Sequence, residues 1–122
     1  MAYLSEVELS DMGFARLGEN VLVSNKCSIY NAHLISLGNH VRIDDFVVIS
    51  PSDQPFEIGN YVHIATHCSL IGRASIMIND FSGLSGRVSI YSSSDDYSGD
   101  FMTNPTVPEE YSNVISKTVK LG

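Results

Sequence analysis

The stretch LGNHVRIDDFVVI, residues 37–49, is repeated in similar form 21 residues later as IGNYVHIATHCSL, residues 58–70. Shorter forms of the same phrase begin at Leu17 (LGENV) and Ile78 (INDFS), so the intervals are 20, 21 and 20 residues. Within each interval aliphatic residues recur every six positions, as at Leu37, Ile43 and Ile49. A period of six fits neither a helix nor an ordinary strand, but it fits a short strand followed by a corner. The repeats therefore predict triangular coils of three strands, stacked roughly 4.8 Å apart in parallel.

Further columns of residues follow from the same period. Positions four residues after each aliphatic predict two more inward columns, which are Val21, Val41, Val62 and Ser82, and Cys27, Val47, Cys68 and Val88. On the third side the expected inward column is His33, Asp53, Ala74 and Ser94, with His33 and Asp53 as a structural polar pair. Cys27 and Cys68 would stand two coils apart, roughly 9.6 Å, which is too far for a disulfide, so both are expected to be buried hydrophobes.

Composition limits the classes of function. The 122 residues suit one domain, 1–122, and 43% of them are hydrophobic. A net charge of -7 argues against binding nucleic acid, because a phosphate backbone needs clustered lysine and arginine. The sequence shows neither a signal peptide nor the roughly 20 apolar residues of a membrane span, so a cytoplasmic protein is expected.

The first sixteen residues predict a short helix that covers one end of the coils. Ser5 and Glu8 have the spacing of a capping box, and Gly13 is a helix stop. The expected segments are this helical cap at 1–16, four coils at 17–95, an extended loop at 92–114 and the start of another coil at 115–122. Because a solenoid that stops there exposes a strand edge, we expect either a fragment or a covering partner.

The hexad rhythm stops after Ile90, and a long insertion follows. A loop of about twenty residues, in a repeat whose other connections are only a few residues long, usually carries function. Its aromatic residues favour an ordered loop, and its acidic pair, Asp95 and Asp96, could orient a sugar hydroxyl or act as a weak base. A solvated acidic loop is the alternative.

The hexads, the [LI]-G-x-x-V phrase and the loop IYSSSDDYSGDFMTNPTVPEEY resemble the hexapeptide-repeat acyltransferases, in particular sugar acetyltransferases of the galactoside and lipopolysaccharide type. The resemblance implies an all-β, left-handed parallel β-helix, a homotrimer, and acetyl-CoA and a sugar or nucleotide-sugar acceptor bound between subunits. It also implies a histidine that acts as general base on the acceptor while backbone N–H groups stabilise the oxyanion. Whether the product is O- or N-acetylated stays open.

The resemblance assigns candidate residues to this chemistry. Galactoside-type members carry the histidine in the loop, whereas no histidine follows His67 here. His63, expected outward at a corner, is therefore the first catalytic candidate and His67, expected outward on the next strand, is the second; His40 is expected on the surface. The substrate candidates in and beside the loop are Asp95, Asp96, Tyr97 and Asn104. The cofactor candidates are Lys117 and Lys120, which could equally be solvated surface charges.

Two other readings remain open. The HIATH spacing at His63 and His67 would suit a zinc enzyme of the gamma carbonic anhydrase type, but a third ligand is not evident and no metal is expected. A non-catalytic, truncated trimeric scaffold is the other. The outward positions include Arg42, Asp44, Asp45 and Arg73, which are expected to face water or a neighbouring subunit.

Overall fold

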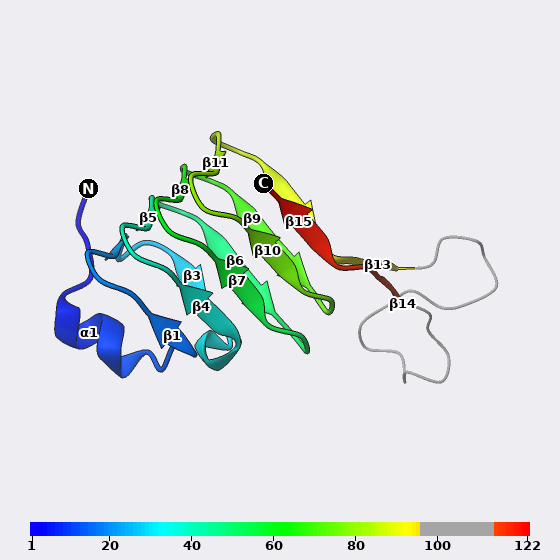
Figure 1. The fold of residues 1–122 in the computed structure, drawn as a ribbon, viewed down its shortest axis with the longest axis horizontal. Helices are drawn as coiled ribbons and strands as arrows, with labels where there is room; N and C mark the ends of the chain where they lie inside the picture. Colours follow the sequence, from blue (N-terminus) through cyan, green and yellow to red (C-terminus); the bar gives the residue numbers. More distant parts are fainter. Residues whose placement is uncertain (96–113) are drawn as a thin grey trace.

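A computed structural model describes the backbone of residues 1–95 and 114–122, and in it the chain winds as a β-solenoid (Figure 1). Each coil has three short strands, and each strand pairs in parallel with its counterpart in the next coil. The solenoid has four turns, as the repeats predict, and it is consistent with the left-handed parallel β-helix that the family resemblance implies.

Three sheets form the sides of the prism. The first face consists of β1 (Arg16–Leu17), β4 (Ile35–Leu37), β7 (Phe56–Ile58), β10 (Ile76–Ile78) and β15 (Val119–Leu121). The second face consists of β2 (Leu22–Val23), β5 (Arg42–Ile43), β8 (His63–Ile64) and β11 (Gly83–Leu84). The third face consists of β3 (Ser28–Ile29), β6 (Val48–Pro51), β9 (Ser69–Gly72) and β12 (Ser89–Tyr91). A separate antiparallel pair joins β13 (Ser93–Asp95) to β14 (Val114–Ser116).

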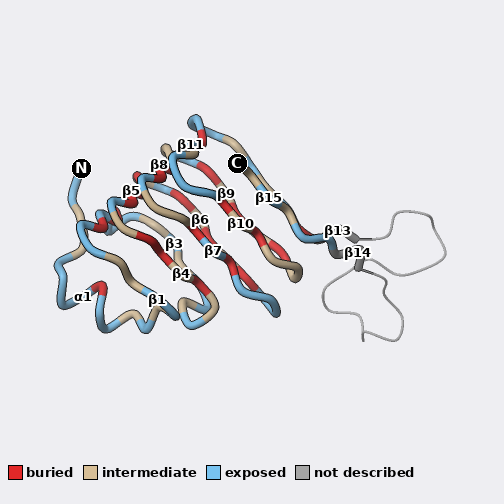
Figure 2. Tube along the Cα trace, in the orientation of Figure 1, coloured by how far each residue is buried: buried red, intermediate tan, exposed pale blue. Residues whose placement is uncertain are grey.

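The core is a set of apolar columns that run along the solenoid axis, visible as buried segments on successive coils in Figure 2. The predicted column through Leu37, Ile58 and Ile78 is confirmed by the strand register, and these side chains are at most 3% exposed. The predicted third-side column is wrong, because Asp53 is exposed and His33 lies in a short 3-10 turn, η1 (Ala32–Leu34). The inward positions there are instead Ile35, Phe56 and Ile76 on the first face.

The corners between the faces are tight and use left-handed backbone. At the first corner, between the first and second faces, positive φ angles recur at Asn20, His40, Tyr61 and Phe81. At the second corner, between the second and third faces, they recur at Phe46, His67 and Arg87. A single residue with φ near 60° turns the chain abruptly, and each of these residues stands at the same place in its coil.

Side-chain oxygens tie successive coils together at the first corner. The backbone N–H of Glu19 donates to Asn39 Oδ1 (2.9 Å), that of Asn39 to Asn60 Oδ1 (2.7 Å), and that of Asn60 to Asp80 Oδ1 (2.7 Å). These bonds satisfy donors that the strand ladders leave unpaired at a corner. The sequence spacing of the bonded residues is 20, 21 and 20.

The glycine of the repeated phrase is required by close stacking. A Cβ atom on Gly38 would lie 2.6 Å from the Gly59 carbonyl oxygen of the next coil, although the φ angle at Gly38 is an ordinary one. Gly18 has the same relationship to Gly38, with a separation of 2.4 Å. The backbones of adjacent coils therefore approach closely here, and only a residue without a Cβ atom fits.

The N-terminal helix α1 (Glu6–Asp11) begins and ends as the sequence predicts. The Ser5 hydroxyl accepts the Glu8 N–H, the Glu8 carboxylate accepts the Ser5 N–H, and Gly13 has φ 80° just beyond the helix. Leu9 is 4% exposed and packs into the core, so α1 covers one end of the apolar interior. None of the helices among the described residues is long and apolar enough to cross a membrane.

Both cysteines are free thiols, as the column assignment predicts. The Cys68 thiol is fully buried and donates to the Ser85 carbonyl oxygen at 3.0 Å. The Cys27 thiol donates to the Asp44 carbonyl oxygen at 2.9 Å, and burial is the main cause that raises its pKa. Each thiol therefore bonds to the following coil rather than to the other cysteine.

The chain leaves and re-enters the solenoid at one point, around Ser92. Ser92 is 2% exposed, and its hydroxyl donates to the Ala74 carbonyl at 2.6 Å. Its carbonyl accepts the Lys117 N–H at 2.7 Å, which joins the outgoing segment to the returning one. This neck, formed by Ser92 with Gly72, Ala74 and Lys117, fixes where β13 and β14 start from the prism.

Candidate functional site

His63 and Asp44 form a hydrogen-bonded pair across two coils of the second face. His63 opens β8, and its Nε2 lies 2.8 Å from Asp44 Oδ2, just beyond β5 in the coil below. Arg42 donates from Nε to the other carboxylate oxygen, Oδ1, at 2.9 Å. The expectation that Asp44 faces water is wrong, since only 7% of its side chain is exposed, and His63 lies on a strand rather than at a corner.

His63 and Arg42 stabilise the ionised form of the Asp44 carboxyl. Burial alone would raise the pKa of this carboxyl, but hydrogen bonds from His63 and Arg42 and their positive charges outweigh burial and lower it. The carboxylate is thus ionised and acceptor-only at neutral pH. In the neutral tautomer of His63 that donates from Nε2 to this carboxylate, Nδ1 is the nitrogen that can accept a proton.

The surface beside His63 is open on the following coil. Gly83 stands directly above His63 in the register, and a Cβ atom built on Gly83 would meet only the His63 carbonyl oxygen, at 3.6 Å. Half of the His63 side chain is exposed. Ser85, two residues after Gly83, is also exposed and follows β11 on the same side of the coil. An imidazole, an exposed glycine and a hydroxyl therefore occur together along the second face.

His67 is in a different environment from His63. It stands at the second corner with φ 62°, not on the next strand as expected, and its ring contacts Phe46 at a centroid distance of 5.1 Å. Across residues 1–95 and 114–122, no group of three or more His, Cys, Asp or Glu side chains could hold a metal ion. The HIATH pair therefore gains no third ligand from this part of the chain.

The remaining candidates lie away from His63. Asp95 ends β13, opposite Val114 of β14, whereas Asp96, Tyr97 and Asn104 fall outside the described residues. Lys117 is exposed beside the neck. Lys120 is exposed on β15, paired with Met77 on the first face. The chain thus separates His63 on the second face and His67 at the second corner from Lys120 on the first face. Lys117 and Asp95 lie apart from both, at and beyond the neck.

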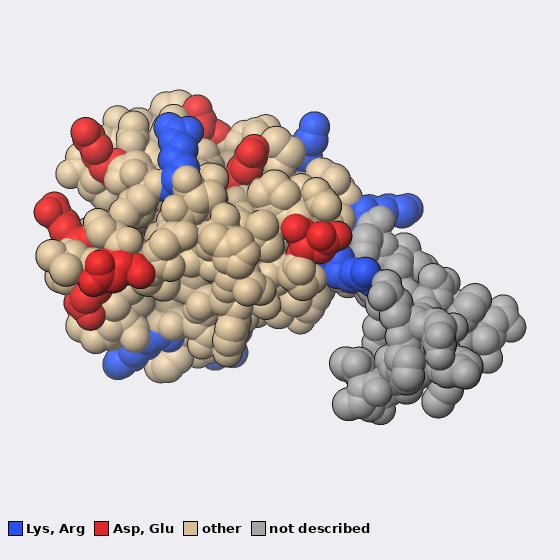
Figure 3. All heavy atoms as spheres, turned by 90° about the horizontal axis from the view of Figure 1, so that it is seen from below, with Lys and Arg blue, Asp and Glu red and all other residues tan. Residues whose placement is uncertain are grey.

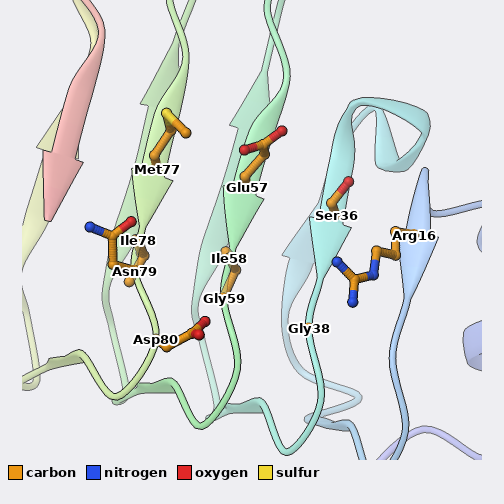
Figure 4. Close-up of a pocket in the computed structure, with 10 residues that line it drawn as sticks. All are labelled: Arg16, Ser36, Gly38, Glu57, Ile58, Gly59, Met77, Ile78, Asn79 and Asp80. Atoms are coloured by element: carbon orange, nitrogen blue, oxygen red, sulfur yellow. The ribbon is translucent and has the colours of Figure 1, made fainter. Parts of the chain in front are cut away.

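A shallow hollow of about 540 Å³ lies on the outer side of the first face (Figure 4). Its floor shows the outward side chains of successive strands in register, Arg16, Ser36, Glu57 and Met77, with Asp80 at the corner. One guanidinium and two carboxylates give the hollow mixed polarity. It contains neither histidine candidate, because His63 and His67 belong to the other two sides of the coil.

Charge is distributed unevenly along the solenoid. On the side shown in Figure 3, acidic side chains gather at the end where α1 lies, and α1 itself carries Glu6, Glu8 and Asp11. Part of the net negative charge of -7 is therefore concentrated at that end. On the second face the ionised Asp44 is paired with Arg42 and His63.

Sequence reasoning missed Asp44 as the partner of His63. The available signal was the spacing of 19 residues between them, two short of the 21 that separate residues stacked directly, as Arg42 and His63 are. A residue two positions along the strand in the coil below is a diagonal neighbour. Ser85 also passed unnoticed, because serine is common at the turns of such repeats.

No protein-family model matches the chain. The chain is 51% identical over all of its 122 residues to the dTDP-4-amino-4,6-dideoxy-D-glucose acyltransferase of Escherichia coli, and it spans 64% of that relative's length. Its structure is similar to that of AntD, an N-acyltransferase from Bacillus cereus, in complex with dTDP and 3-hydroxybutyryl-CoA. The TM-score is 0.91 at 42% identity, over 98% of this chain and 63% of AntD.

Further AntD structures describe variants at one serine and at one aspartate ten positions later. The serine-to-cysteine variant was determined with dTDP-4-amino-4,6-dideoxyglucose and coenzyme A (TM-score 0.91, 42% identity, 98% of this chain and 63% of AntD). The aspartate-to-alanine variant was determined with dTDP and coenzyme A (TM-score 0.91, 41% identity, 99% of this chain and 64% of AntD). The chain is therefore similar in sequence and in structure to these acyltransferases, and its β-solenoid is consistent with the fold of the hexapeptide-repeat acyltransferases.

Proposed function

We propose that this chain forms the greater part of an acyl-CoA-dependent N-acyltransferase whose acceptor is a dTDP-linked 4-amino-4,6-dideoxysugar. The observation that carries the proposal is 51% identity along the whole chain to an acyltransferase of that sugar. The AntD complexes with coenzyme A and dTDP-4-amino-4,6-dideoxyglucose support both substrates. Acetyl-CoA is the simplest donor; 3-hydroxybutyryl-CoA in AntD shows that related proteins take a longer acyl chain.

The reaction moves an acyl group from sulfur to nitrogen. The neutral amine at C4 of the sugar attacks the thioester carbonyl, the C–N bond forms, and the tetrahedral intermediate expels coenzyme A as its thiolate. The attacking nitrogen loses one proton during this sequence, and the thiolate takes one up. The protein must therefore orient the amine, stabilise the oxyanion and accept a proton.

The His63–Asp44 pair is suited to proton transfer. Asp44 fixes the imidazole through Nε2, so Nδ1 can accept the proton of the amine. The absence of a side chain at Gly83, which stands above His63 in the register, leaves room for a substrate group beside the imidazole. In this proposal His63 is the base and Asp44 is a positioning residue, which ranks His63 ahead of His67.

Ser85 and Asp95 are candidates for substrate contacts. Of all serines in this chain, Ser85 alone has an aspartate ten residues later, and that is the spacing of the serine and aspartate varied in AntD. A serine hydroxyl can donate to the developing oxyanion, and an aspartate can accept from the sugar amine. Asp96, Tyr97 and Asn104 are further candidates for the sugar, and Lys117 and Lys120 for the phosphates of the cofactor.

A homotrimer is part of the same proposal. Ser85 lies on the second face, whereas Asp95 lies beyond the third face on β13. Residues on different sides of one prism can meet a single substrate when the loop base of one copy lies against the second face of another. The cytoplasm, where coenzyme A thioesters and nucleotide sugars are available, is the proposed location.

The test is acyl transfer by the full-length protein that carries this chain, with acetyl-CoA and dTDP-4-amino-4,6-dideoxyglucose, measured by release of the coenzyme A thiol and by product mass. We expect Ser85→Ala and Asp95→Asn to lower kcat/KM by about tenfold or more. Ser89→Ala and Asp53→Asn, two exposed positions outside the site, are matched controls that should stay within about twofold. A folded protein that acylates no dTDP-linked amino sugar would refute the proposal.

A further inference from the structure

Asp44 is fixed through its backbone as well as through its side chain. Its N–H donates to the Ile64 carbonyl oxygen of the following coil at 3.0 Å, and its carbonyl oxygen accepts the Cys27 thiol of the preceding coil at 2.9 Å. The main chain of Asp44 is therefore held between its two neighbouring coils. Only the orientation of the carboxylate remains to be set, and a single hydrogen bond from His63 would leave the carboxylate free to rotate.

Arg42 supplies the second contact that sets this orientation. Its Nε donates to Oδ1 of Asp44 at 2.9 Å, while Nε2 of His63 lies 2.8 Å from Oδ2, so each carboxylate oxygen has its own donor. Hydrogen bonds between ionised groups are stronger and more directional than those between neutral groups. Because only 7% of the Asp44 side chain is exposed, little water can replace either donor. The imidazole therefore meets an acceptor whose position is fixed.

Arg42 also stands next to His63 in the outward column of the second face. The strand register places Arg42 directly below His63, with Leu22 below Arg42 and Gly83 above His63. Of these four residues only Arg42 carries a permanent charge. The two backbones are roughly 4.8 Å apart, as in any pair of adjacent strands. A guanidinium at this distance opposes a second positive charge on the imidazole.

The other titratable groups near the pair are already engaged. Asp45 accepts the Ser24 hydroxyl. Tyr3, in the N-terminal segment that bridges to Ser24, interacts through its phenol with the guanidinium of Arg42. Asp44 first, and this phenol second, raise the pKa of Arg42 above its usual value. Arg42 is therefore a cation at every pH at which the imidazole titrates.

We propose that Arg42 is a positioning residue for acyl transfer. It holds Asp44 in the orientation that the imidazole requires, and its charge promotes release of the proton that His63 accepts at Nδ1. In the proposed reaction this proton comes from the attacking amine and passes on to the coenzyme A thiolate, so a base that retained it would delay the next turnover. The inference rests on the proposed function, and it adds to the His63–Asp44 pair a third member that acts through them.

The test separates the charge of Arg42 from its hydrogen bond. Arg42→Lys retains the positive charge without the planar guanidinium, whereas Arg42→Gln retains an N–H donor without the charge. Arg16→Gln, an exposed arginine on β1 of the first face, is the matched control. The Arg42 side chain is half exposed, so we expect all three variants to fold, and circular dichroism and urea unfolding check this.

Two readouts are taken over a range of pH on the full-length protein that carries this chain. The first is kcat and KM for acetyl-CoA and dTDP-4-amino-4,6-dideoxyglucose. The second is the titration of the His63 ring, followed by NMR of protein labelled with 15N-histidine and assigned by the signal that His63→Gln removes.

We expect Arg42→Gln to lower kcat by about fivefold or more with KM within about twofold, because the base is less well placed. The acidic limb of its kcat/KM profile should move to higher pH by roughly half a pH unit, since a neighbouring cation is lost, and the NMR midpoint should move with it. Arg42→Lys and Arg16→Gln should leave both the limb and the midpoint in place.

An NMR midpoint that is the same in Arg42→Gln and in the unsubstituted protein would overturn the inference. So would a midpoint that moves while the acidic limb does not, because Arg42 would then act on an imidazole that takes no part in the reaction. An equal shift in Arg42→Lys would show that the charge is not the cause. Absence of acyl transfer by the folded, unsubstituted protein refutes the proposed function instead, and the NMR midpoint then still shows whether Arg42 controls the imidazole.

Discussion

Asp44 accepts hydrogen bonds from His63 at 2.8 Å and from Arg42 at 2.9 Å, one to each carboxylate oxygen, while only 7% of its own side chain is exposed. The partners are half exposed, so the buried member of the cluster is the anion and the cationic groups shield it from solvent. This arrangement both stabilises the second face and orients the imidazole. The two roles lead to separate measurements.

Asp44→Asn should destabilise the fold by about 1–3 kcal/mol, because it removes a charged acceptor from two donors. The pKa of Asp44 is lowered in the folded state, so its contribution to stability is complete above about pH 4, the usual pKa of an unfolded aspartate. The contribution is lost as the pH falls through the lower folded-state value. Urea unfolding should therefore show a large difference from the unsubstituted chain near pH 7 that shrinks toward pH 3. An equal difference at both pH values would contradict this account.

His63→Gln should reduce the kcat of acyl transfer by about a hundredfold or more, since a glutamine retains a hydrogen bond to Asp44 but cannot accept a proton. Asp44→Asn should lower kcat as well, with little change in KM, because it permits the wrong imidazole tautomer. His33→Gln, at a corner on the opposite side of the coil, is the control. A His63→Gln enzyme with undiminished kcat would show that the pair is only structural.

Gly38→Ala should destabilise the solenoid by about 1–3 kcal/mol or more, because its Cβ would lie 2.6 Å from a carbonyl oxygen of the next coil. Gly86→Ala is the matched control, since its Cβ would meet the Thr66 carbonyl oxygen at an ordinary 3.5 Å. The midpoints of thermal unfolding should separate the two variants. Similar midpoints would mean that adjacent coils can move apart without cost.

Gly72→Ala should disrupt the neck more than Ser92→Ala does. Ser92→Ala removes one buried donor, at a cost of about 1 kcal/mol, whereas a Cβ on Gly72 would lie 2.0 Å from Ser92 Oγ and 2.8 Å from its backbone nitrogen. Because the second clash is with backbone, the double variant should remain as unstable as Gly72→Ala. Urea unfolding of all three variants measures this. Rescue by Ser92→Ala would show that the hydroxyl alone limits the space.

The solenoid fold could be predicted from the sequence because its apolar residues recur at a fixed period. The six-residue spacing of Leu37, Ile43 and Ile49 fixes which positions point inward on two faces, and the capping box at Ser5 defines the helix. The third side was misread because the corner there varies in length, from the 3-10 turn at Ala32–Leu34 to the segment around Asp53, so the six-residue count loses its place. The solenoid core then continues at Ile35 and Phe56 instead.

The site was less readable because it depends on diagonal neighbours. The sequence identifies His63 as an outward histidine, but its partner, Asp44, stands 19 residues earlier and is buried. The two adjacent aspartates of DDF instead suggest a pair that faces solvent. Asp45 does behave differently, since it accepts the Ser24 hydroxyl. Which of two adjacent aspartates becomes the buried one is decided by the register of the coil above, and that register is a property of the folded chain.

The side-chain oxygens at the first corner fix the register between successive coils. The oxygen of Asn39, Asn60 or Asp80 reaches the N–H of the coil below only when the two coils align, whether they are separated by 20 or 21 residues. A strand that slipped by one residue would lose that bond and turn its apolar side chains outward. Differences in coil length are therefore absorbed at the third corner, beside the place where the long insertion leaves after β12. In such a molecule evolution can lengthen the third corner, provided that the hydrogen bonds at the first corner are kept.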